Sequence, residues 1–289
     1  MTRATTRLRA LLARDGLAMA GGAHDALSAR IVEQTGFPLC VVTGAGVSVC
    51  RGFPDVGLLG LEENVRNARY IAEAVDIPVI VDADNGYGNA INVRRTVREF
   101  EAAGVAGIHI EDQTWPKRCG HMFGKSVIPK DEMAQKIRAA REARRDPDFV
   151  VIARCDALMV NGLEDTLERG EAYLEAGVDM LFFEMRESME EIRAMAERFR
   201  GRIPLHFNNS PSGMVPRLHI SEIEALGFKT AAFYVHALMA ACRTMREVLE
   251  TILATGNAEA VWERMVPFDQ FWEIVGLAEI RELERRYGV

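Results

Sequence analysis

The feature that most constrains the fold of this chain is a seven-residue spacing between a glycine and a polar residue. Four pairs share it: Gly36 and Thr43, Gly104 and Glu111, Gly177 and Glu184, and Gly201 and Asn208. In two of them the surrounding text also recurs, as EAAGVAGIHIE and LEAGVDMLFFE. A glycine suits the left-handed end of a helix, and the short apolar segment after it is typical of a buried parallel strand. The spacing predicts repeated helix–strand units, each with a polar residue at the carboxyl end of its strand.

Short apolar runs, most of them rich in Val, Ile or Phe, mark the expected strands. They are Leu17–Ala20, Leu39–Thr43, Val79–Asp82, Gly107–Glu111, Phe149–Arg154, Met180–Glu184, Ile203–Asn208 and Thr230–Tyr234. Segments with helical periodicity separate them. The clearest are Leu61–Val75, Ile91–Ala103, Lys130–Ala143, Asp165–Ala176 and Ser188–Phe199.

Eight strands that alternate with helices predict an α/β fold, a closed (β/α)8 TIM-type barrel. An open, doubly wound sheet is the alternative, but eight similar units favour closure. No Gly-, Ser- or Pro-rich linker divides the chain. We therefore expect one barrel domain over residues 1–289, with a helical C-terminal tail from about residue 255.

Composition excludes several classes of protein. The 289 residues carry a net charge of -7, which argues against nucleic acid as a partner. No stretch is apolar enough to cross a membrane, and Arg9 and Arg14 interrupt the apolar run at the N-terminus, so no secretory signal is expected. The five cysteines are scattered, without a C-x-x-C pair, which favours a reducing cytoplasm over a disulfide framework or a zinc site.

The expected strand ends carry an unusual set of carboxylates. Asp82 and Asp84 follow the third strand, and Glu111 ends the fourth. In such a barrel these ends meet at one mouth, where the carboxylates would repel one another unless a cation lies between them. Ligands that are all oxygen favour Mg²⁺ or Mn²⁺. The alternative for any single residue is a solvated loop position or a helix cap.

The loop after the fourth strand reads WPKRCGHMFGKS and collects basic residues around one cysteine. Cations beside Cys119 favour its thiolate, and Gly120 and Gly124 would let the loop move as a lid. Gly44-Ala45-Gly46, after the second strand, offers backbone N–H groups for a carboxylate or a phosphate, although an ordinary tight turn also explains it. His109, His206 and His236 fit packing or capping roles better than catalysis.

Three motifs, in this order along the chain, resemble the isocitrate lyase/phosphoenolpyruvate mutase superfamily. Pro54-Asp55-Val56-Gly57 is similar to its P-D-x-G element, Asp82 to Asn89 (DADNGYGN) to its D-A-D-x-G-Y-G-N element, and Lys117 to His121 (KRCGH) to its K-[KR]-C-G-H signature. The resemblance extends from Gly22 to about residue 255. It implies a (β/α)8 barrel whose last helix is swapped with a neighbouring subunit, a homotetramer built as a dimer of dimers, and a small di- or tricarboxylate ligand bound with Mg²⁺.

The resemblance also implies a role for each matching residue. Asp82 would bind the metal, with Asp55, Asp84 and Glu111 holding it directly or through water. Cys119 would be the catalytic acid/base, and Arg154 would bind the hydroxyl or oxo group. The other expected substrate contacts and catalytic residues are Thr43, Gly44, Ala45, Asp55, Gly120, His121, Glu184, Asn208 and Ser210.

These parts predict a carbon–carbon lyase in carboxylic acid metabolism. When the hydroxyl of a β-carboxy-α-hydroxy acid becomes an alkoxide, stabilised by a divalent cation, its collapse to a ketone breaks the C–C bond. Lys117, Arg118 and His121 can stabilise the departing enediolate. The Cys119 thiol then protonates its carbon. The expected products are an oxo acid such as pyruvate and a simple carboxylate.

Departures from the family pattern bear on the substrate. The stretch 237–240 lacks the Arg that isocitrate- and methylisocitrate-cleaving relatives carry, and Ser210-Pro211 replaces their T-E pair. Val235 replaces the usual Pro, and Arg154-Cys155-Asp156 replaces the common R-T-D. A third substrate carboxylate is therefore less well supported, and a branched C4 diacid such as a dimethylmalate fits better.

Three other functions remain open from the sequence. The first is a P–C bond enzyme, such as a carboxyphosphonoenolpyruvate mutase, since some of these relatives also carry K-R-C-G-H. The second is an oxaloacetate hydrolase or decarboxylase, although decarboxylase relatives often lack the cysteine. The third is a metabolite-binding barrel without catalysis, against which the intact Asp82, Asp84, Glu111 and Cys119 argue.

Overall fold

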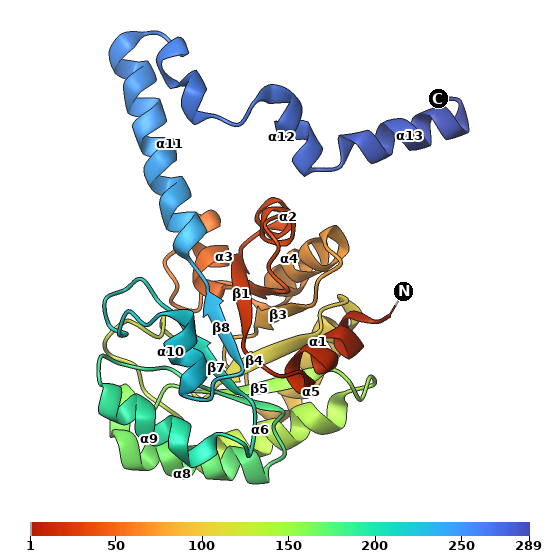
Figure 1. Ribbon diagram of the computed structural model, residues 1–289. Helices are drawn as coiled ribbons and strands as arrows, with labels where there is room; N and C mark the ends of the chain where they lie inside the picture. The colour runs from red at the N-terminus through yellow and green to blue at the C-terminus, as the bar shows by residue number, and fades with distance from the viewer. Residues whose placement is uncertain (1) are drawn as a thin grey trace. The chain divides into compact units, whose positions relative to one another are not determined.

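In the computed structural model, which describes residues 2–289, eight strands form one closed parallel barrel in the order β1 to β8 (Figure 1). Its strands are β1 (Ala18–Ala23), β2 (Leu39–Val42), β3 (Val79–Asp82), β4 (Gly107–Glu111), β5 (Val150–Cys155), β6 (Met180–Phe183), β7 (Leu205–Asn208) and β8 (Thr230–Phe233). The barrel closes where β1 pairs with β8, with Ala18 opposite Thr230. The predicted barrel is thus confirmed.

Helices follow the strands and surround the barrel (Figure 1). Those of the first 235 residues are α1 (Ala4–Ala13), α2 (Ala26–Gln34), α3 (Gly44–Cys50), α4 (Leu61–Ala74), α5 (Ala90–Ala102), α6 (Lys130–Ala143), α7 (Leu158–Asn161), α8 (Leu163–Glu175), α9 (Met189–Phe199) and α10 (Ile220–Ala225). Side-chain caps fix several starts, since Asp25, Asn89 and Ser188 accept from N–H groups of the first turns of α2, α5 and α9. The four glycines of the repeat have φ between 75° and 96°, as helix-ending residues do.

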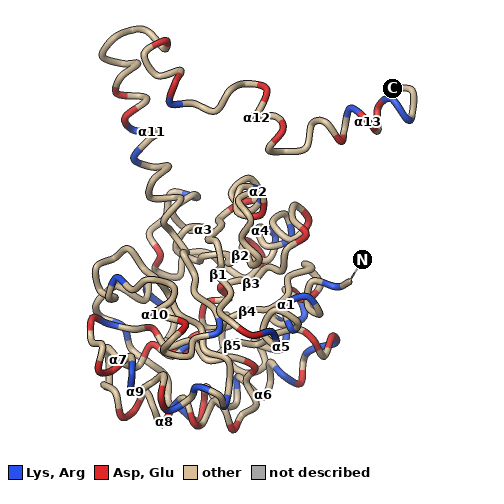
Figure 2. The backbone as a smooth tube through the Cα atoms, in the orientation of Figure 1, with Lys and Arg blue, Asp and Glu red and all other residues tan. Residues whose placement is uncertain are grey.

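Apolar side chains form two clusters, one inside the barrel and one between the barrel and the helices. Inside, alternate strand residues such as Leu39, Ile80, Ile152 and Phe182 form one cluster, which Leu8 of α1 joins. The other strand residues point outward and pack against the helices in a second, larger cluster. Both signs of charge are distributed over the outer helices (Figure 2). Because both strand faces are buried, the only places for chemistry are the strand ends and their loops.

The first strand extends further than its apolar run predicted, from Ala18 to Ala23 instead of ending at Ala20. Gly21 and Gly22 account for the extension. A Cβ atom on Gly22 would lie 2.0 Å from the carbonyl oxygen of Tyr234, so β1 approaches the end of β8 more closely than any side chain allows. Glycine has low strand propensity, and the sequence pattern alone therefore ended the strand too early.

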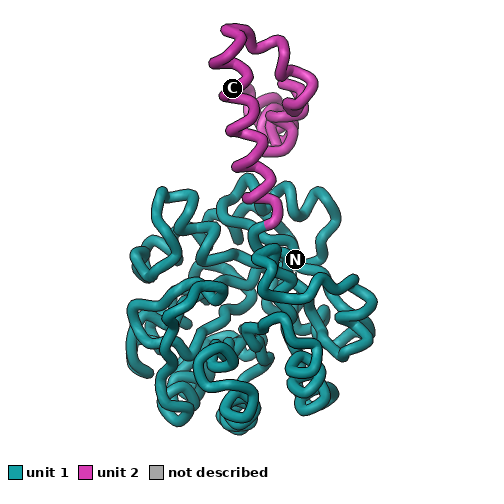
Figure 3. The backbone as a smooth tube through the Cα atoms, turned by 90° about the vertical axis from the view of Figure 1, so that its left-hand side faces the viewer, with its two compact units in different colours: residues 1–235 teal, residues 236–289 magenta. Residues whose placement is uncertain are grey.

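Residues 236–289 form a second compact unit (Figure 3). Its elements are α11 (His236–Thr255), the 3-10 helix η1 (Glu259–Arg264), α12 (Phe268–Ile274) and α13 (Leu277–Tyr287). Arg264 of η1 forms an ion pair with Glu247 of α11 at 2.7 Å. Many large apolar side chains of this unit are exposed, among them Leu253, Trp262, Met265, Phe268, Phe271 and Trp272. Across the described residues, no helix combines the length and the hydropathy that a bilayer crossing needs.

Candidate active site at the carboxyl ends of the strands

The carboxyl end of the barrel brings the predicted acidic residues together around one buried lysine. Lys117 is 3% exposed, and its Nζ lies 2.5 Å from Oδ1 of Asp55 and 2.9 Å from Oδ1 of Asp84. Asp55 comes from the loop after α3 and Asp84 from the turn after β3, so the lysine ties two separate loops to the mouth of the barrel. Burial alone would lower the pKa of Lys117, but the surrounding carboxylates raise it well above its usual value. The lysine therefore stays charged.

The turn after β3 holds Asp82 and Asp84 in a constrained backbone. Asp84 has φ 47° and Tyr87 has φ 59°, which non-glycine residues rarely adopt. The N–H of Asp84 donates to Oδ1 of Asp82 at 3.0 Å, and the N–H of Gly44 donates to Oδ2 at 3.2 Å. The buried Lys136 of α6 donates to the carbonyl oxygen of Asn85 at 3.1 Å. Such strained positions are typical of functional loops.

The two aspartates of this turn differ in proton affinity. Burial raises the pKa of Asp84 to about 6, and the neighbouring Asp82 and Asp55 add to the effect. Burial would also raise the pKa of Asp82, but His109, Lys117 and Arg154 hold it below its usual value. Asp82 therefore stays ionised to a lower pH than Asp84.

Arg154, at the end of β5, gathers three further carboxylates. Its guanidinium lies 3.0 Å from Glu184 of the β6 end, 2.8 Å from Asp156 and 3.5 Å from Glu111. Burial raises the pKa of Glu111 well above its usual value, and neither of its oxygens accepts a hydrogen bond. Buried carboxylate oxygens without a partner are costly, so Glu111 is a site where a further donor or a cation belongs.

The loop with Cys119 lies against this cluster. The Cys119 N–H donates to the carbonyl oxygen of Asp55 at 3.0 Å. His121 Nε2 lies 3.1 Å from Oε1 of Glu184, and His121 Nδ1 lies 3.4 Å from Oγ of Ser210. Burial alone would lower the pKa of His121, but the Glu184 carboxylate and the Cys119 side chain raise it to about 10. The imidazole beside the half-buried thiol is thus positively charged at neutral pH.

The other predicted site residues divide into two groups. Asn208 Nδ2 donates to Oε1 of Glu184 at 3.2 Å, and Thr43 caps α3, so both lie at the same mouth. Gly44 and Ala45 form the first turn of α3 beside Asp82. The Arg118 side chain, in contrast, is exposed, and its backbone N–H and carbonyl are held by Gln113 at 3.0 and 2.9 Å. Its predicted role at the enediolate has no contact in this structure to support it.

The donor set at the mouth fits a hydrated divalent cation. Within residues 2–289, no three His, Cys, Asp or Glu side chains are close enough together to enclose a metal ion by themselves. Mg²⁺ usually keeps several waters and binds one or two carboxylates directly, and the partnerless oxygens of Glu111 can accept from such waters. Asp82, with Asp55, Asp84 and Glu111 around it, therefore fits Mg²⁺ or Mn²⁺ held largely through water.

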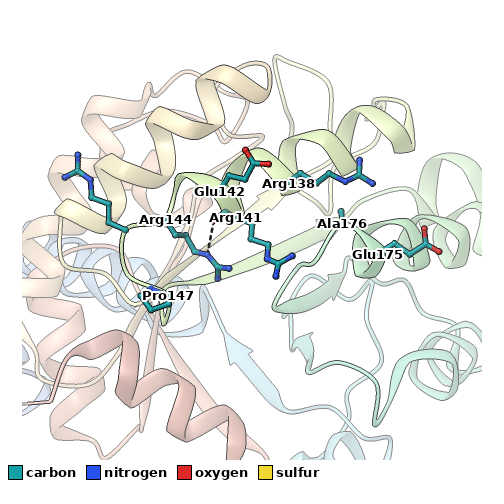
Figure 4. Close-up of a pocket in the computed structure, with 8 residues that line it drawn as sticks. Arg138, Arg141, Glu142, Arg144, Pro147, Glu175 and Ala176 are labelled. Atoms are coloured by element: carbon teal, nitrogen blue, oxygen red, sulfur yellow. Dashed lines mark hydrogen bonds between the residues drawn. The ribbon is translucent and has the colours of Figure 1, made fainter.

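A cavity of about 560 Å³ lies at the amino ends of β5 and β6, and four arginines line it (Figure 4). One of them has a structural role: Arg144 donates to the carbonyl oxygen of Phe149 and to Asp179, both at 2.8 Å. It also donates to the carbonyl oxygen of Arg141 near the end of α6, where cations are favoured by the helix dipole. This cavity faces away from the carboxylate cluster.

A closed (β/α)8 barrel with charged side chains buried at the carboxyl ends of its strands defines an enzyme-type barrel. The family model described as phosphoenolpyruvate phosphomutase matches residues 8–253. The chain belongs to the isocitrate lyase/phosphoenolpyruvate mutase superfamily.

Three related proteins illustrate the range of the family. Over 283 residues the chain is 42% identical to a 2,3-dimethylmalate lyase of Eubacterium barkeri, covering 98% of this chain and 97% of that protein. It is 40% identical to a chloroplastic carboxyvinyl-carboxyphosphonate phosphorylmutase of Arabidopsis thaliana, covering 99% and 85%. A phosphonopyruvate hydrolase solved with oxalate and Mg²⁺ superimposes with a TM-score of 0.91 at 34% identity and covers 100% of both chains.

The structure adds several buried groups that the sequence analysis did not single out. Asp156 pairs with Arg154, Lys125 pairs with Asp156, and Gln113 clamps the loop at Arg118. Lys136 supports the turn after β3. The one sequence signal for Asp156 was its position directly after a strand end, in Arg154-Cys155-Asp156. Lys125 belongs to the basic loop around Cys119, whereas Gln113 and Lys136 come from a loop and a helix where the sequence carries no comparable signal.

Proposed function

We propose that this protein is a carbon–carbon lyase, which cleaves a substituted malate or a methylisocitrate-like hydroxy acid into an oxo acid and a carboxylate. One observation carries the proposal: the Cys119 loop lies closed over a buried group of carboxylates and cations, with Arg154 beneath it. We expect the thiol and the group that binds the hydroxyl to act on one reacting carbon from either side. The similarity to a 2,3-dimethylmalate lyase over 98% of the chain supports the same reaction.

The substrate is expected to bind through its carboxylate and its hydroxyl. Thr43, Gly44 and Ala45 at the start of α3 lie at the mouth beside Asp82 and are the proposed contacts of the carboxylate. Arg154 can donate to the hydroxyl oxygen, because its guanidinium already lies among the strand ends. Glu184, which accepts from Asn208 and pairs with His121, fixes the far side of the pocket.

Cleavage converts the hydroxyl to a carbonyl group and releases an enediolate. Arg154 stabilises negative charge on the hydroxyl oxygen as its proton passes to the neighbouring Glu184 carboxylate. The C–C bond breaks, and its electron pair moves onto the departing carboxylate, which the charged Lys117 and His121 stabilise. The Cys119 thiol then gives its proton to the carbon, leaving a thiolate beside the His121 imidazolium. Lid closure excludes water from this step.

A divalent cation is the expected cofactor. Bound by Asp82, it would supply positive charge for the carboxylate and the hydroxyl of the substrate. Asp82→Ala should abolish the binding of Mn²⁺, measured by electron paramagnetic resonance, while the circular dichroism spectrum stays unchanged. Exhaustive treatment with EDTA should remove activity, and added Mg²⁺ should restore it. Full turnover of the EDTA-treated protein would contradict the requirement.

A branched C4 diacid, such as a dimethylmalate, is the substrate we favour, because the sequence lacks the arginine expected for a third carboxylate. The test measures pyruvate, oxalate and phosphate released from a panel that contains 2,3-dimethylmalate, 2-methylisocitrate, oxaloacetate and phosphonopyruvate, each with and without Mg²⁺. Pyruvate from a hydroxy diacid alone supports the lyase. Turnover of oxaloacetate or phosphonopyruvate alone would replace it with a hydrolase or a P–C bond enzyme.

The P–C bond enzyme is the second candidate because of the 40% identity to a carboxyvinyl-carboxyphosphonate phosphorylmutase. The same pocket could hold an anionic phosphonate among Lys117, His121 and Arg154. Isomerisation of phosphonopyruvate, followed by ³¹P nuclear magnetic resonance, separates this activity from C–C cleavage.

We further propose that the protein works as a homo-oligomer in the cytoplasm, a dimer of dimers with exchanged C-terminal helices. The exposed aromatic side chains of residues 236–289 support the assembly, because monomers rarely expose apolar patches of this kind. Scattered free cysteines support the compartment.

A further inference from the structure

The loop that carries Cys119 ends in a lysine whose ammonium group is buried. The Lys125 side chain is 2% exposed, although Met122 and Phe123 in the same loop are exposed. Its Nζ donates to the carbonyl oxygen of Gly120 at 2.6 Å and to Oδ1 of Asp156 at 2.8 Å. A buried charge is costly unless it is paired and hydrogen-bonded, and these two acceptors satisfy that need. The proposed chemistry gives this lysine no role.

Asp156 joins the loop lysine to the arginine that is proposed to hold the substrate. Its carboxylate is fully buried and also accepts from Arg154 Nε at 2.8 Å and Nη2 at 3.2 Å. Burial would raise the pKa of Asp156, but the charges of Arg154 and Lys125 hold it below its usual range. One ionised carboxylate therefore pairs with both cations.

Asp156 is itself fixed by a buried polar network beneath the site. Its backbone N–H donates to Oδ1 of Asp112 at 2.8 Å. The other oxygen of Asp112 accepts from the Tyr173 hydroxyl at 2.7 Å and from Arg169 at 3.1 Å. Satisfied networks of this kind rigidify their members, so Lys125 is bonded to a rigid part of the barrel.

Gly120, the other acceptor of Lys125, lies directly on the Arg154–Glu184 ion pair. A Cβ atom at Gly120 would lie 2.3 Å from Arg154 Nη2 and 2.4 Å from Glu184 Oε2. The loop backbone therefore touches the two side chains with no room for a side chain between them. Whatever fixes the Gly120 carbonyl also fixes the distance between the Cys119 loop and Arg154.

We infer that Lys125 is a positioning residue. It connects the Cys119 loop through Asp156 to Arg154 and so fixes the position of the Cys119 thiol relative to the Arg154 guanidinium. Its effect on turnover rests on the proposed function, whereas its effect on the loop does not. The length of the lysine stem suits the role, because it spans from the end of the loop back to Gly120 and inward to Asp156.

The test compares Lys125→Met with wild type and with Lys130→Met, a control that removes a lysine whose side chain is 42% exposed and pairs with Glu168. The first readout needs no turnover: the rate at which iodoacetamide labels Cys119, relative to the exposed Cys50 and Cys242. Lys125→Met should raise this ratio about tenfold or more, as expected when local opening loses a charge-assisted hydrogen bond. Lys130→Met should leave it unchanged.

The second readout is the split between kcat and KM for the hydroxy diacid that wild type cleaves. Lys125→Met should lower kcat by about tenfold to a hundredfold while KM changes much less, because reacting groups are misplaced and binding contacts remain. An unchanged labelling ratio overturns the inference. A raised ratio with unchanged kcat overturns the link to Arg154. If wild type cleaves no hydroxy diacid, the proposed function fails, and the labelling ratio still decides whether Lys125 holds the loop.

A second variant keeps the test open if Lys125→Met does not fold. Lys125→Gln keeps a polar end but is neutral and shorter, so it cannot satisfy both Gly120 and Asp156. The same rise in Cys119 labelling is expected. A folded Lys125→Gln variant with wild-type labelling and kcat would contradict the inference.

Discussion

The barrel mouth buries charged side chains, whereas the C-terminal unit exposes apolar ones. At the mouth Glu111 and Asp156 are 0% exposed; ion pairs and hydrogen bonds hold Asp156, and Glu111 lies 3.5 Å from Arg154. In residues 236–289, Leu253 is 88% and Phe268 77% exposed. Buried charge is tolerated where partners are supplied within the chain, and exposed apolar surface marks a contact that another molecule supplies. We infer from this difference that the mouth holds most of its charge with partners from the same chain, and we propose that a second molecule covers the C-terminal unit.

The largest expected effect breaks the chemistry of the barrel mouth. Cys119→Ser should lower C–C cleavage by about 10²–10⁴-fold, the usual contribution of a positioned acid, since a serine hydroxyl is much less acidic than a thiol. Substrate affinity, measured by calorimetry, should change little because the carboxylate contacts remain. Near-normal cleavage of every hydroxy diacid by Cys119→Ser would remove the assigned role of the thiol.

The next effect tests whether partners within the barrel make its buried charge tolerable. Arg169→Met removes the cation 3.1 Å from Asp112, a carboxylate that is 0% exposed. The free energy of unfolding should fall by about 3 kcal/mol or more, since breaking one side of a buried pair leaves an uncompensated charge. Urea unfolding measures this. Arg243→Met, which changes an exposed arginine, serves as the control and should leave the urea midpoint unchanged. An equal loss of unfolding free energy in both variants would show that the buried pair contributes no more than an exposed one.

A smaller effect is expected on the C-terminal side. Phe268→Asp or Trp272→Asp should weaken the oligomer by about 2 kcal/mol or more for each lost aromatic anchor. Light scattering at micromolar concentration should then show smaller particles, while the barrel keeps its circular dichroism spectrum. A wild-type protein that is already monomeric would refute the interface.

A pH dependence is also expected at the loop. Because Glu184 and the Cys119 side chain, against the opposing effect of burial, raise the pKa of His121 to about 10, the folded value exceeds the unfolded one of ~6.5. The stabilisation is therefore complete below about pH 6.5 and is lost as the pH rises toward 10. The difference in unfolding free energy between wild type and His121→Gln should shrink over this range. A constant difference from about pH 6 to 10 would show that the ion pair contributes nothing.

Most of the barrel could be predicted because its signal is periodic. Each of the spacings from Gly104 to Glu111 and from Gly177 to Glu184 predicts one helix end and the strand that follows it. In a barrel of parallel strands the carboxyl ends of these strands then lie close together. The apolar pattern predicts too short a β1, because it does not include Gly21 and Gly22. These glycines let β1 approach the end of β8 closely, and composition does not reveal that contact.

The site could be predicted only where strand ends or motifs point to it. Asp82 and Glu111 follow from strand ends alone, and Cys119 from its basic neighbours. The link from Lys125 to Asp156 joins residues 31 positions apart and depends on how far one side chain reaches into the fold. The exposed position of Arg118 depends in the same way on Gln113, which holds the loop backbone.

The most direct test of the lyase assignment is cleavage in D₂O. With a hydroxy diacid and Mg²⁺, the account predicts pyruvate and a carboxylate in equal amounts, the carboxylate carrying one deuterium at the carbon that Cys119 protonates. Proton nuclear magnetic resonance reads both values in one sample. Pyruvate without an equal amount of carboxylate, or a carboxylate with no deuterium at that carbon, would contradict cleavage through an enediolate that the enzyme protonates.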